Sequence, residues 1–285
     1  MKLARYVVGG KTFLGEVRYA NVRDLIQGSA KDDLLRLYLG GGHTAREIER
    51  QLAEVSFLSP VMQPSKIVCV GLNYRDHCLE TGSPIPDHPV LFNKFPSSIV
   101  GPRDSIIVDR SVTSRVDFEV ELAIVIGRSC RRVSERNAFD SVFGYTVAND
   151  VSARDLQFVD TQWMLGKALD TFCPLGPVIV TRDEINDPQH LKLRCSVNGT
   201  VYQDSSTSEM IFGVAELLAY ISRGITLEPG DVILTGTPAG VGFTRKPPVY
   251  LEDGDMVKAE IEGIGSLENP VLEIRGLPEH GNAEA

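Results

Sequence analysis

Long apolar runs and clustered cysteines are both missing from this sequence of 285 residues. No stretch of about 18 apolar residues occurs, so no membrane-spanning helix is expected, and the first residues hold no apolar stretch long enough for a signal peptide. The five cysteines are an odd, scattered set without a CxxC pair. This usage is typical of a reduced setting, and a cytoplasmic location is therefore predicted.

Clustered positive charge is also scarce. The formal net charge is -9, and no run of lysine and arginine exceeds two or three residues. Nucleic-acid backbones and anionic membranes attract basic surfaces, so neither is expected as the main partner. The sequence therefore predicts no local basic patch.

Several common catalytic motifs are absent as well. The sequence contains no GxSxG for a serine hydrolase, no HExxH for a zinc protease, and no GxGxxG after a strand. Four of the histidines have no metal-ligand spacing: His43, His88, His190 and His280. The chemistry must therefore lie in other residues.

Residues 1–60 differ in pattern from the rest of the chain. The stretch "KLARYVVGGKTFLGEV" predicts a hairpin with a Gly-Gly turn, and short helices are predicted at residues 32–42 and 44–55. In the second helix, Thr44 and Glu47 have capping-box spacing. The segment "LSPVMQPSK" reads as a linker. We therefore predict a small N-terminal domain (residues 1–60) and a main domain (residues 61–285).

From Lys66 onward the pattern is rich in strands. Only two helices have clear signals, one after "SERNAFD" and one within "SEMIFGVAELLAYISRG", where Gly224 is placed to end it. Many strands with few helices predict a mainly β body with some helix, in the α+β class.

The stretch "VDFEVELAIVIG" (residues 116–127) predicts a strand with an unusual run of acids. Asp117, Glu119 and Glu121 occupy every second position and so share one face, while the other face is apolar throughout. Glutamates two residues apart on one face can place carboxylate oxygens on a single hard cation, such as Mg²⁺, Mn²⁺ or Ca²⁺. A plain acidic strand edge is the alternative.

A third carboxylate ends the strand predicted in "GYTVANDVSARDLQ" (residues 144–157). There Asp150 either completes a three-carboxylate site or caps the next helix. Arg154 and Gln157 follow within two turns and suit an anionic or carbonyl-bearing ligand. Lys167, among glycine and small residues, is expected to be partly buried beside the carboxylates, unless it is a surface lysine.

His77 and Glu80 are three residues apart in "GLNYRDHCLETG" (residues 71–82). On a helical turn they share a face, and the carboxylate can orient the imidazole as a general base toward water. A surface His–Glu pair is the alternative. The glycine- and proline-rich segment that follows is predicted to be a mobile lid. In the turn "LTGTPAGVGF" (residues 234–243), Thr235 or Thr237 could hold a carboxylate.

Six ordered motifs make the sequence similar to the fumarylacetoacetate hydrolase family over roughly residues 60–275. They are "KIVCVGLNYRDHCLETG", "DFEVELAIVIG", "GYTVANDVSARDLQ", "GKALDTFCPLGP", "LEPGDVILTGTPAGVGF" and "DGDMVKAEIEGIGSLENPV". The resemblance implies a mixed β-sandwich or β-roll catalytic domain with a small N-terminal accessory domain, and a homodimer. One departure is "NKFPSS" (residues 93–98), where many relatives have proline directly after the lysine.

The resemblance also implies roles for single residues. A divalent metal is expected on three carboxylates: Glu119, Glu121 and Asp150. The pair His77 and Glu80 matches the water-activating dyad. The positions near the substrate are Lys167, as a catalytic residue, with Arg154, Gln157 and Thr237. Asp117 matches no ligand and is expected to support the site from behind.

The expected reaction is hydrolysis of a C–C bond in a 2,4-dioxo acid of acylpyruvate or fumarylpyruvate type, through an enolate held on Mg²⁺. Lys167 would offset the excess negative charge and stabilise the enolate. The same enolate forms by loss of CO₂ or by a proton shift. Decarboxylation of oxaloacetate or of a homoprotocatechuate-pathway dioate, and keto–enol isomerisation, are therefore alternatives. A non-catalytic metal-binding scaffold is the alternative of another class.

Overall fold

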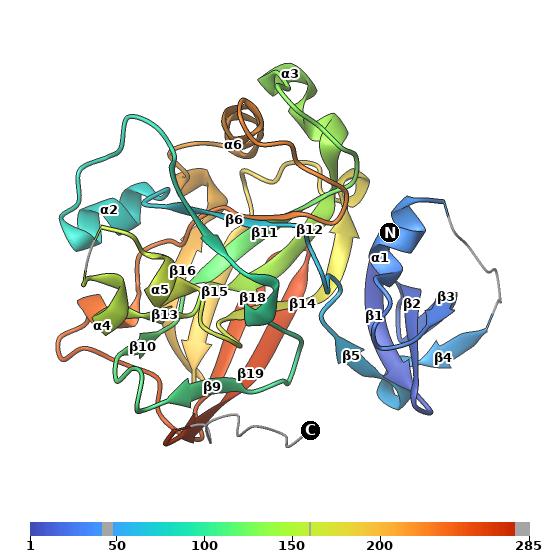
Figure 1. Ribbon diagram of the computed structural model, residues 1–285, viewed down its shortest axis with the longest axis horizontal. Helices are drawn as coiled ribbons and strands as arrows, with labels where there is room; N and C mark the ends of the chain where they lie inside the picture. Colours follow the sequence, from blue (N-terminus) through green and yellow to red (C-terminus); the bar gives the residue numbers. More distant parts are fainter. Residues whose placement is uncertain (42–47, 160, 277–285) are drawn as a thin grey trace, which may run out of the picture.

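The computed structural model describes residues 1–41, 48–159 and 161–276 (Figure 1). Strands are the commonest regular element of the molecule, and short helices lie around them. The N-terminal strands form a smaller lobe beside a larger body, at the right of the view. The mainly β, α+β fold that the sequence predicts is thereby confirmed.

The described residues form one two-stranded sheet and two large sheets. The larger has, in spatial order, β4 (Glu49–Gln51), β3 (Asn21–Gly28), β2 (Lys11–Arg18), β1 (Lys2–Val8), β14 (Cys173–Thr181), β12 (Val142–Asn149), β11 (Val120–Ile126), β17 (Val232–Leu234), β6 (Ile67–Gly71) and β7 (Val90–Lys94), with β5 (Ser56–Leu58) on β1 and β8 (Ile99–Val100) on β14. The smaller has β16 (Thr200–Ser206), β15 (Lys192–Val197), β18 (Met256–Ile261), β19 (Gly265–Ile274) and β9 (Ile106–Asp109).

The N-terminal lobe continues the large sheet of the body. The predicted hairpin is present as β1 and β2, and β1 pairs in antiparallel fashion with β14, with Leu3 opposite Ile179. The sequence analysis missed β3, and its predicted helix at residues 44–55 is wrong over 49–51, which form β4. The proposed cap residues Thr44 and Glu47 lie outside the described residues. A division of the chain at about residue 60 stays a prediction.

The helices are short. They are α1 (Leu34–Leu39), α2 (Arg75–Thr81), α3 (Glu135–Ala138), α4 (Arg154–Gln157), α5 (Met164–Lys167) and α6 (Val214–Ser222). The helix predicted within "SEMIFGVAELLAYISRG" is present as α6, which ends two residues before Gly224. The helix predicted after "SERNAFD" is wrong in position, because α3 lies within that stretch and β12 begins at Val142. Residues 83–89, predicted as a lid, form neither helix nor strand. No helix among the described residues is long and apolar enough to cross a bilayer.

Strand β11 is the centre of the core. It is buried at every position, as expected for a strand covered on both faces. Its alternating residues enter two hydrophobic clusters: Val120, Leu122, Ile124 and Ile126 belong to the larger one, Ala123 and Val125 to the other. The predicted transition from an acidic to an apolar face along this strand is therefore present.

The prediction of one continuous strand over residues 116–127 is wrong. It divides into β10 (Val116–Asp117), which pairs with β13 (Ser152–Ala153), and β11. Between them, Glu119 N–H donates to Asn149 Oδ1 (2.9 Å) and Val120 N–H donates to Gln203 Oε1 (2.9 Å). Side chains thus replace the sheet partners at this break, and Asp117 is separated from the face that carries the two glutamates.

Candidate active site

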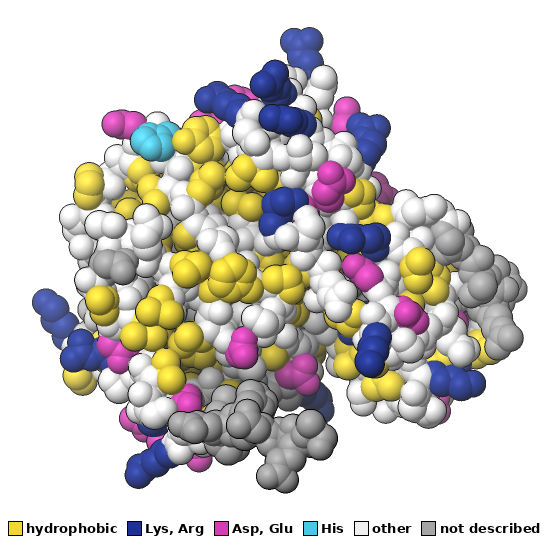
Figure 2. Space-filling view, in the orientation of Figure 1, with side chains coloured by type: hydrophobic (Ala, Val, Ile, Leu, Met, Phe, Trp, Pro, Cys, Tyr) yellow, Lys and Arg dark blue, Asp and Glu magenta, His cyan; other side chains and the backbone are white. Residues whose placement is uncertain are grey.

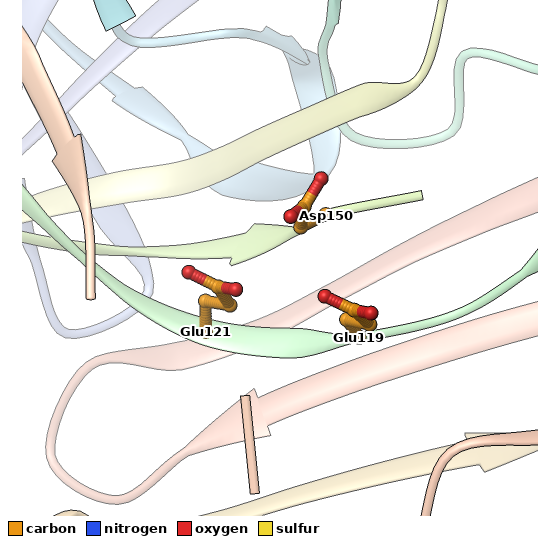
Figure 3. A group of neighbouring side chains, drawn as sticks. All are labelled: Glu119, Glu121 and Asp150. Carbon is orange, nitrogen blue, oxygen red and sulfur yellow. The ribbon is translucent and has the colours of Figure 1, made fainter. Parts of the chain in front are cut away.

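The ends of β11 and β12 bring three buried carboxylates together (Figure 3). Val120 lies opposite Asn149, so Glu119 and Asp150 continue the antiparallel register, and Asp150 N–H donates to Glu119 O (2.9 Å). Glu121 projects from β11 toward the same point. One ligand oxygen of each carboxylate lies within 4.8 Å of the other two. The structure therefore brings together the three side chains that the sequence predicts as ligands.

Glu119 and Glu121 differ in their charge environment. Lys167 Nζ donates to Glu119 Oε2 (2.7 Å), and Arg154 Nη2 lies 2.7 Å from Oε1. Burial would raise the pKa of Glu119, but these two cations lower it to about 2. Glu121 accepts a backbone hydrogen bond (2.8 Å) and forms no ion pair with any described residue. Burial and the charges of Asp150 and Glu119 raise its pKa well above the usual range.

Two buried lysines hold Asp150 from both sides. Lys167 Nζ donates to Oδ2 (2.7 Å), and Lys94 Nζ lies 2.7 Å from Oδ1. Lys94 also donates to the carbonyl oxygens of Val151 (3.1 Å), Phe172 (2.7 Å) and Lys167. The sequence analysis missed Lys94. Its only local signal is a lysine that ends the apolar stretch "VLFNK", where the strand buries it.

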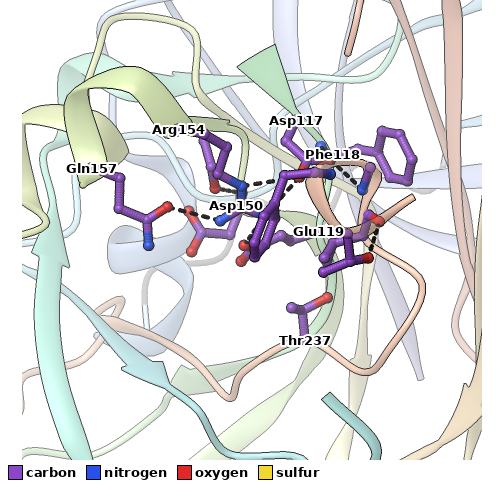
Figure 4. A network of polar contacts seen from close by, with 12 residues as sticks. Asp117, Phe118, Glu119, Asp150, Arg154, Gln157 and Thr237 are labelled. Atoms are coloured by element: carbon purple, nitrogen blue, oxygen red, sulfur yellow. Dashed lines mark hydrogen bonds and ion pairs between the residues drawn. The ribbon is translucent and has the colours of Figure 1, made fainter. Parts of the chain in front are cut away.

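The guanidinium group of Arg154 is occupied by contacts with other side chains of the site (Figure 4). Its Nε donates to Asp117 Oδ2 (2.9 Å) and its Nη1 to Gln157 Oε1 (2.8 Å), and the Phe243 ring covers the guanidinium at 4.5 Å. Burial would lower the pKa of Arg154, while Asp117 and Glu119 raise it. Its contacts show Arg154 supporting two carboxylates, and direct substrate binding stays a prediction.

Asp117 supports this network from behind, as the sequence analysis expects. Besides Arg154, it accepts hydrogen bonds from the backbone N–H groups of Gly242 (2.7 Å) and Phe243 (3.0 Å). It is fully buried. Asp117 therefore ties the loop after β17 to the start of the acidic segment.

Helix α2 places His77 and Glu80 side by side, with Nδ1 of the ring 3.5 Å from Glu80 Oε2. Glu80 is itself fixed by the N–H of Gly240 (2.9 Å) and the hydroxyl of Thr244 (2.8 Å). Burial would raise the pKa of Glu80, but the His77 ring and these two donors lower it. The predicted pair is thus assembled, with an anchored carboxylate behind a buried imidazole.

Gln157 and Thr237, both predicted to bind substrate, already use part of their hydrogen-bonding capacity within the protein. Gln157 Oε1 accepts from Arg154, so its Nε2 is the amide group left for a ligand. Thr237 Oγ1 donates to Val120 O (3.0 Å) and accepts from Gln203 Nε2 (2.8 Å). The hydroxyl proton of Thr237 is therefore used by β11. Gln203, which the sequence analysis missed, carries no local signal that separates it from other strand residues.

A cavity of about 220 Å³ collects these side chains. Its polar lining contains His77, Glu119, Glu121, Asp150, Arg154, Gln157, Lys167 and Thr237. Much of the remaining wall is aromatic, with Phe92 and Trp163 in edge contact (5.6 Å). Of the two threonines considered, Thr237 lines the cavity, while Thr235 is fully buried and donates to Leu122 O (2.9 Å).

The donor set fits a hard divalent cation. Four buried carboxylates and three buried cations make up the cluster: Asp117, Glu119, Glu121 and Asp150 with Lys94, Arg154 and Lys167. One negative charge is therefore in excess, and the raised pKa of Glu121 reflects it. Asp150 Oδ1 is buried and accepts no hydrogen bond, although Lys94 Nζ lies 2.7 Å away as an ion-pair partner. Oxygen ligands of this kind suit Mg²⁺, Mn²⁺ or Ca²⁺.

Comparison with known proteins covers most of the chain. A family model described as "Fumarylacetoacetate (FAA) hydrolase C-terminal" matches residues 66–272. The chain is 53% identical over 222 residues to the Xenopus laevis protein named oxaloacetate tautomerase fahd2, mitochondrial, over 77% of this chain and 69% of that protein. It is 48% identical over 223 residues to oxaloacetate tautomerase YisK of Bacillus subtilis (strain 168), over 77% and 74%.

A solved structure agrees with these matches. Fumarylacetoacetate hydrolase from psychrophilic Exiguobacterium antarcticum aligns with a TM-score of 0.86 at 43% identity, over 96% of this chain and all of that one. The family match spans every residue assigned above to the candidate site. The resemblance stated from the six motifs is thereby confirmed, and the chain is an enzyme that belongs to the fumarylacetoacetate hydrolase family.

Proposed function

We propose that this enzyme catalyses the keto–enol tautomerisation of a short 2-oxo dicarboxylic acid, with oxaloacetate as the substrate. The observation that carries the proposal is one small cavity in which a buried carboxylate triad lies with an imidazole backed by a glutamate. The names of the Xenopus and Bacillus relatives support this choice over C–C bond hydrolysis, the main prediction from sequence.

Glu119, Glu121 and Asp150 would hold the metal, which we propose to be Mg²⁺, with Mn²⁺ or Ca²⁺ as substitutes. When bound, the ion would polarise the 2-oxo group as a Lewis acid and so acidify the neighbouring C–H bond. Lys167 supplies a fixed ammonium at the same wall of the cavity. Its positive charge favours the oxygen on which negative charge develops during enolisation.

His77 is proposed as the proton carrier. Tautomerisation removes a proton from C3 and delivers one to the oxygen at C2, so one base that holds the proton in between is sufficient. Glu80 lies at Nδ1, which leaves Nε2 as the ring nitrogen available to the substrate. The anchoring of Glu80 by Gly240 and Thr244 keeps the imidazole oriented.

The size and polarity of the cavity support a short substrate. Its volume of about 220 Å³ is below the roughly 300–1,000 Å³ typical of sites for drug-sized ligands. Both cations in its lining, Arg154 and Lys167, are already paired with carboxylates. We therefore propose Gln157 Nε2 as the donor to the second carboxylate of the substrate.

Hydrolysis of a C–C bond in a 2,4-dioxo acid is the second candidate, because the same imidazole could activate water. One experiment separates the reactions. The ultraviolet decay of enol oxaloacetate is followed with purified enzyme, in Mg²⁺ and in EDTA, beside assays of acylpyruvate cleavage and of CO₂ release. We expect Mg²⁺-dependent enol decay to be the fastest. Faster cleavage would favour the hydrolase, and faster CO₂ release the decarboxylase.

Assembly and location remain proposals as well. We propose a homodimer, which sedimentation of the purified protein tests directly. We also propose a cytoplasmic location, although the Xenopus relative is named as mitochondrial. The accessory role of residues 1–60 is a third proposal, and a variant lacking them would show whether turnover depends on the lobe.

A further inference from the structure

A group of arginines lies at the end of α6, away from the residues of the candidate site. Four exposed arginines lie in residues 128–136 (Arg128, Arg131, Arg132 and Arg136) and a fifth, Arg223, directly follows α6, with Arg132 and Arg223 lining one hollow. Figure 2 shows lysine and arginine side chains crowded at the top of the view, over α3 and α6 of Figure 1. The prediction of no local basic patch is therefore wrong for this surface.

These arginines have no ion-pair partners among the described residues. None of the five forms an ion pair with a carboxylate in residues 1–41, 48–159 or 161–276. Some exposed arginines elsewhere form such pairs, for example Arg194 with Asp204 (2.8 Å) and Arg18 with Glu16 (2.8 Å), whereas Arg75, Arg103 and Arg115 form none with the described residues. In a chain with a net charge of -9, five uncompensated positive charges on one surface are an exception.

The loop that carries three of them, Arg128, Arg131 and Arg132, is held against α6 by hydrogen bonds, and Arg136 lies in α3. Arg132 N–H donates to Ser222 O (2.7 Å), Val133 N–H donates to Ser222 Oγ (3.1 Å), and Cys130 exchanges two backbone hydrogen bonds with Leu227. Arg132 itself has a left-handed φ of 54°. Because a non-glycine residue rarely adopts this conformation, the surrounding contacts must define the position of the loop.

A hollow opens between the loop and the helix. It is lined by Arg132, Ser134, Glu135 and Arg223, together with Val133 and Ala219. The guanidinium of Arg223 lies over the ring of Tyr220 at 5.4 Å, which holds its plane while leaving N–H groups at its edge. Glu135 is the single carboxylate in this lining, so positive charge predominates.

We propose that this hollow binds a small, multiply charged phosphate compound, either a free polyphosphate or the phosphate chain of a nucleotide. Planar guanidinium groups pair with phosphate oxygens in a bidentate manner, and the charges of Arg132 and Arg223 together exceed that of Glu135 in the lining. Stabilisation of the negative C-terminal end of α6 is the purely structural alternative. That role would affect stability and would not require binding of an anion.

The test measures the affinity of the Mg²⁺-loaded enzyme for triphosphate and for ATP by calorimetry at near-physiological ionic strength. The double variant Arg132→Asn with Arg223→Gln should weaken binding of triphosphate at least about tenfold, since two charged hydrogen-bonding groups are lost. Asparagine tolerates the left-handed conformation at position 132. ATP binding much tighter than triphosphate would identify a nucleotide as the source of the phosphate.

Two single variants sharpen the result. Arg103→Asn is the matched control, because Arg103 is also exposed, has a φ of 67° and lies elsewhere, with its N–H bonded to Glu268 O (2.8 Å). It should leave the affinity unchanged. Glu135→Gln should tighten binding by removing the opposing charge. Absence of saturable binding, equal loss in the control, or full affinity in the double variant would each overturn the proposal.

Discussion

The N-terminal lobe and the body each bury a group of charges, and the two groups differ in balance. In the lobe, Asp24 accepts hydrogen bonds from Arg50 Nε (3.1 Å) and Nη2 (2.8 Å) and from the Tyr6 hydroxyl. The single carboxylate of this group, Asp24, is thus paired with the cation of Arg50. In the body, carboxylates outnumber cations by one, and Glu121 has no cationic partner among the described residues.

This difference separates a structural group from a functional one. Burial is similar in both, since Asp24 is 5% exposed and Glu121 is 1% exposed. A buried charge without a partner is costly, so the group either takes up a proton, as the raised pKa of Glu121 indicates, or is neutralised by a ligand of opposite charge. The count of charges, rather than the degree of burial, therefore distinguishes the group of carboxylates that could hold a cation.

The largest effect is expected for Glu121→Gln. Because the pKa of Glu121 is raised without a cation, a neutral amide should leave the metal-free protein about as stable as the parent. Turnover should fall to background, and the Mg²⁺-induced rise in melting temperature should vanish. Calorimetry and the enol assay measure both, with the exposed Glu49→Gln as control. A retained Mg²⁺ shift would contradict the ligand assignment.

His77→Ala should lower the turnover number about 10²–10⁴-fold while sparing Mg²⁺ binding, because it removes the proton carrier and no ligand. The matched control is His190→Ala. That exposed histidine also has an acid three residues away, with Nδ1 2.6 Å from Asp187 Oδ2, yet lies outside the cavity lining. Equal losses in the two variants would show that His77 has no special role.

In the lobe, Asp24→Ala should lower the free energy of unfolding by about 1–3 kcal/mol, because Arg50 and the Tyr6 hydroxyl lose their acceptor. Turnover per folded molecule should stay the same. Urea unfolding and the enol assay measure the two quantities. A loss of turnover comparable to that of the body variants would erase the distinction drawn between the two groups.

The affinity for Mg²⁺ should increase with pH. Burial and the neighbouring carboxylates raise the pKa of Glu121, so below that pKa the ion must displace a proton. Affinity should then rise by up to about tenfold per pH unit and level off above the raised pKa. Calorimetry in buffers of different ionisation enthalpy counts the released proton. No release between mildly acidic and neutral pH would show that Glu121 is already ionised.

The smallest effect is expected for Tyr6→Phe, about 1 kcal/mol of unfolding free energy. Burial and the hydrogen bond to Asp24 raise the pKa of Tyr6. The neutral phenol is therefore favoured in the fold. The contribution of the Tyr6 phenol to the free energy of unfolding is complete below the ordinary tyrosine pKa, near 10. It is lost as the pH rises through the raised pKa of the folded state. Urea unfolding at neutral and strongly alkaline pH tests this, with the exposed Tyr19→Phe as control.

Much of the candidate site was predictable because its signals are local. Acids two apart on a strand share a face, and residues three apart on a helical turn lie side by side, which is enough to pair Glu119 with Glu121 and His77 with Glu80. Asp150 follows from its place at a strand end. The β-rich class likewise follows from many short apolar segments, whereas β3 has a weaker pattern, with charged residues between its apolar ones.

The errors occurred where distant segments decide the outcome. The acidic strand breaks at Glu119 because Asn149 and Gln203 bond its backbone, and neither is a local neighbour. Arg154 has the chemistry of a substrate-binding residue, but Asp117 and Glu119 lie close enough to pair with it. No periodicity reports such contacts.

By itself, then, the sequence determined which side chains could form the site: three carboxylates, an imidazole with its acid, and a lysine. Only the tertiary structure decided how charge is distributed among them, with Lys94 added to the cluster, Glu119 ionised and Glu121 short of a cation. It also decided that Arg132 and Arg223 line one hollow. The physical reason is that Coulomb energies and desolvation depend on distance and burial, and both are set by segments far apart in the chain.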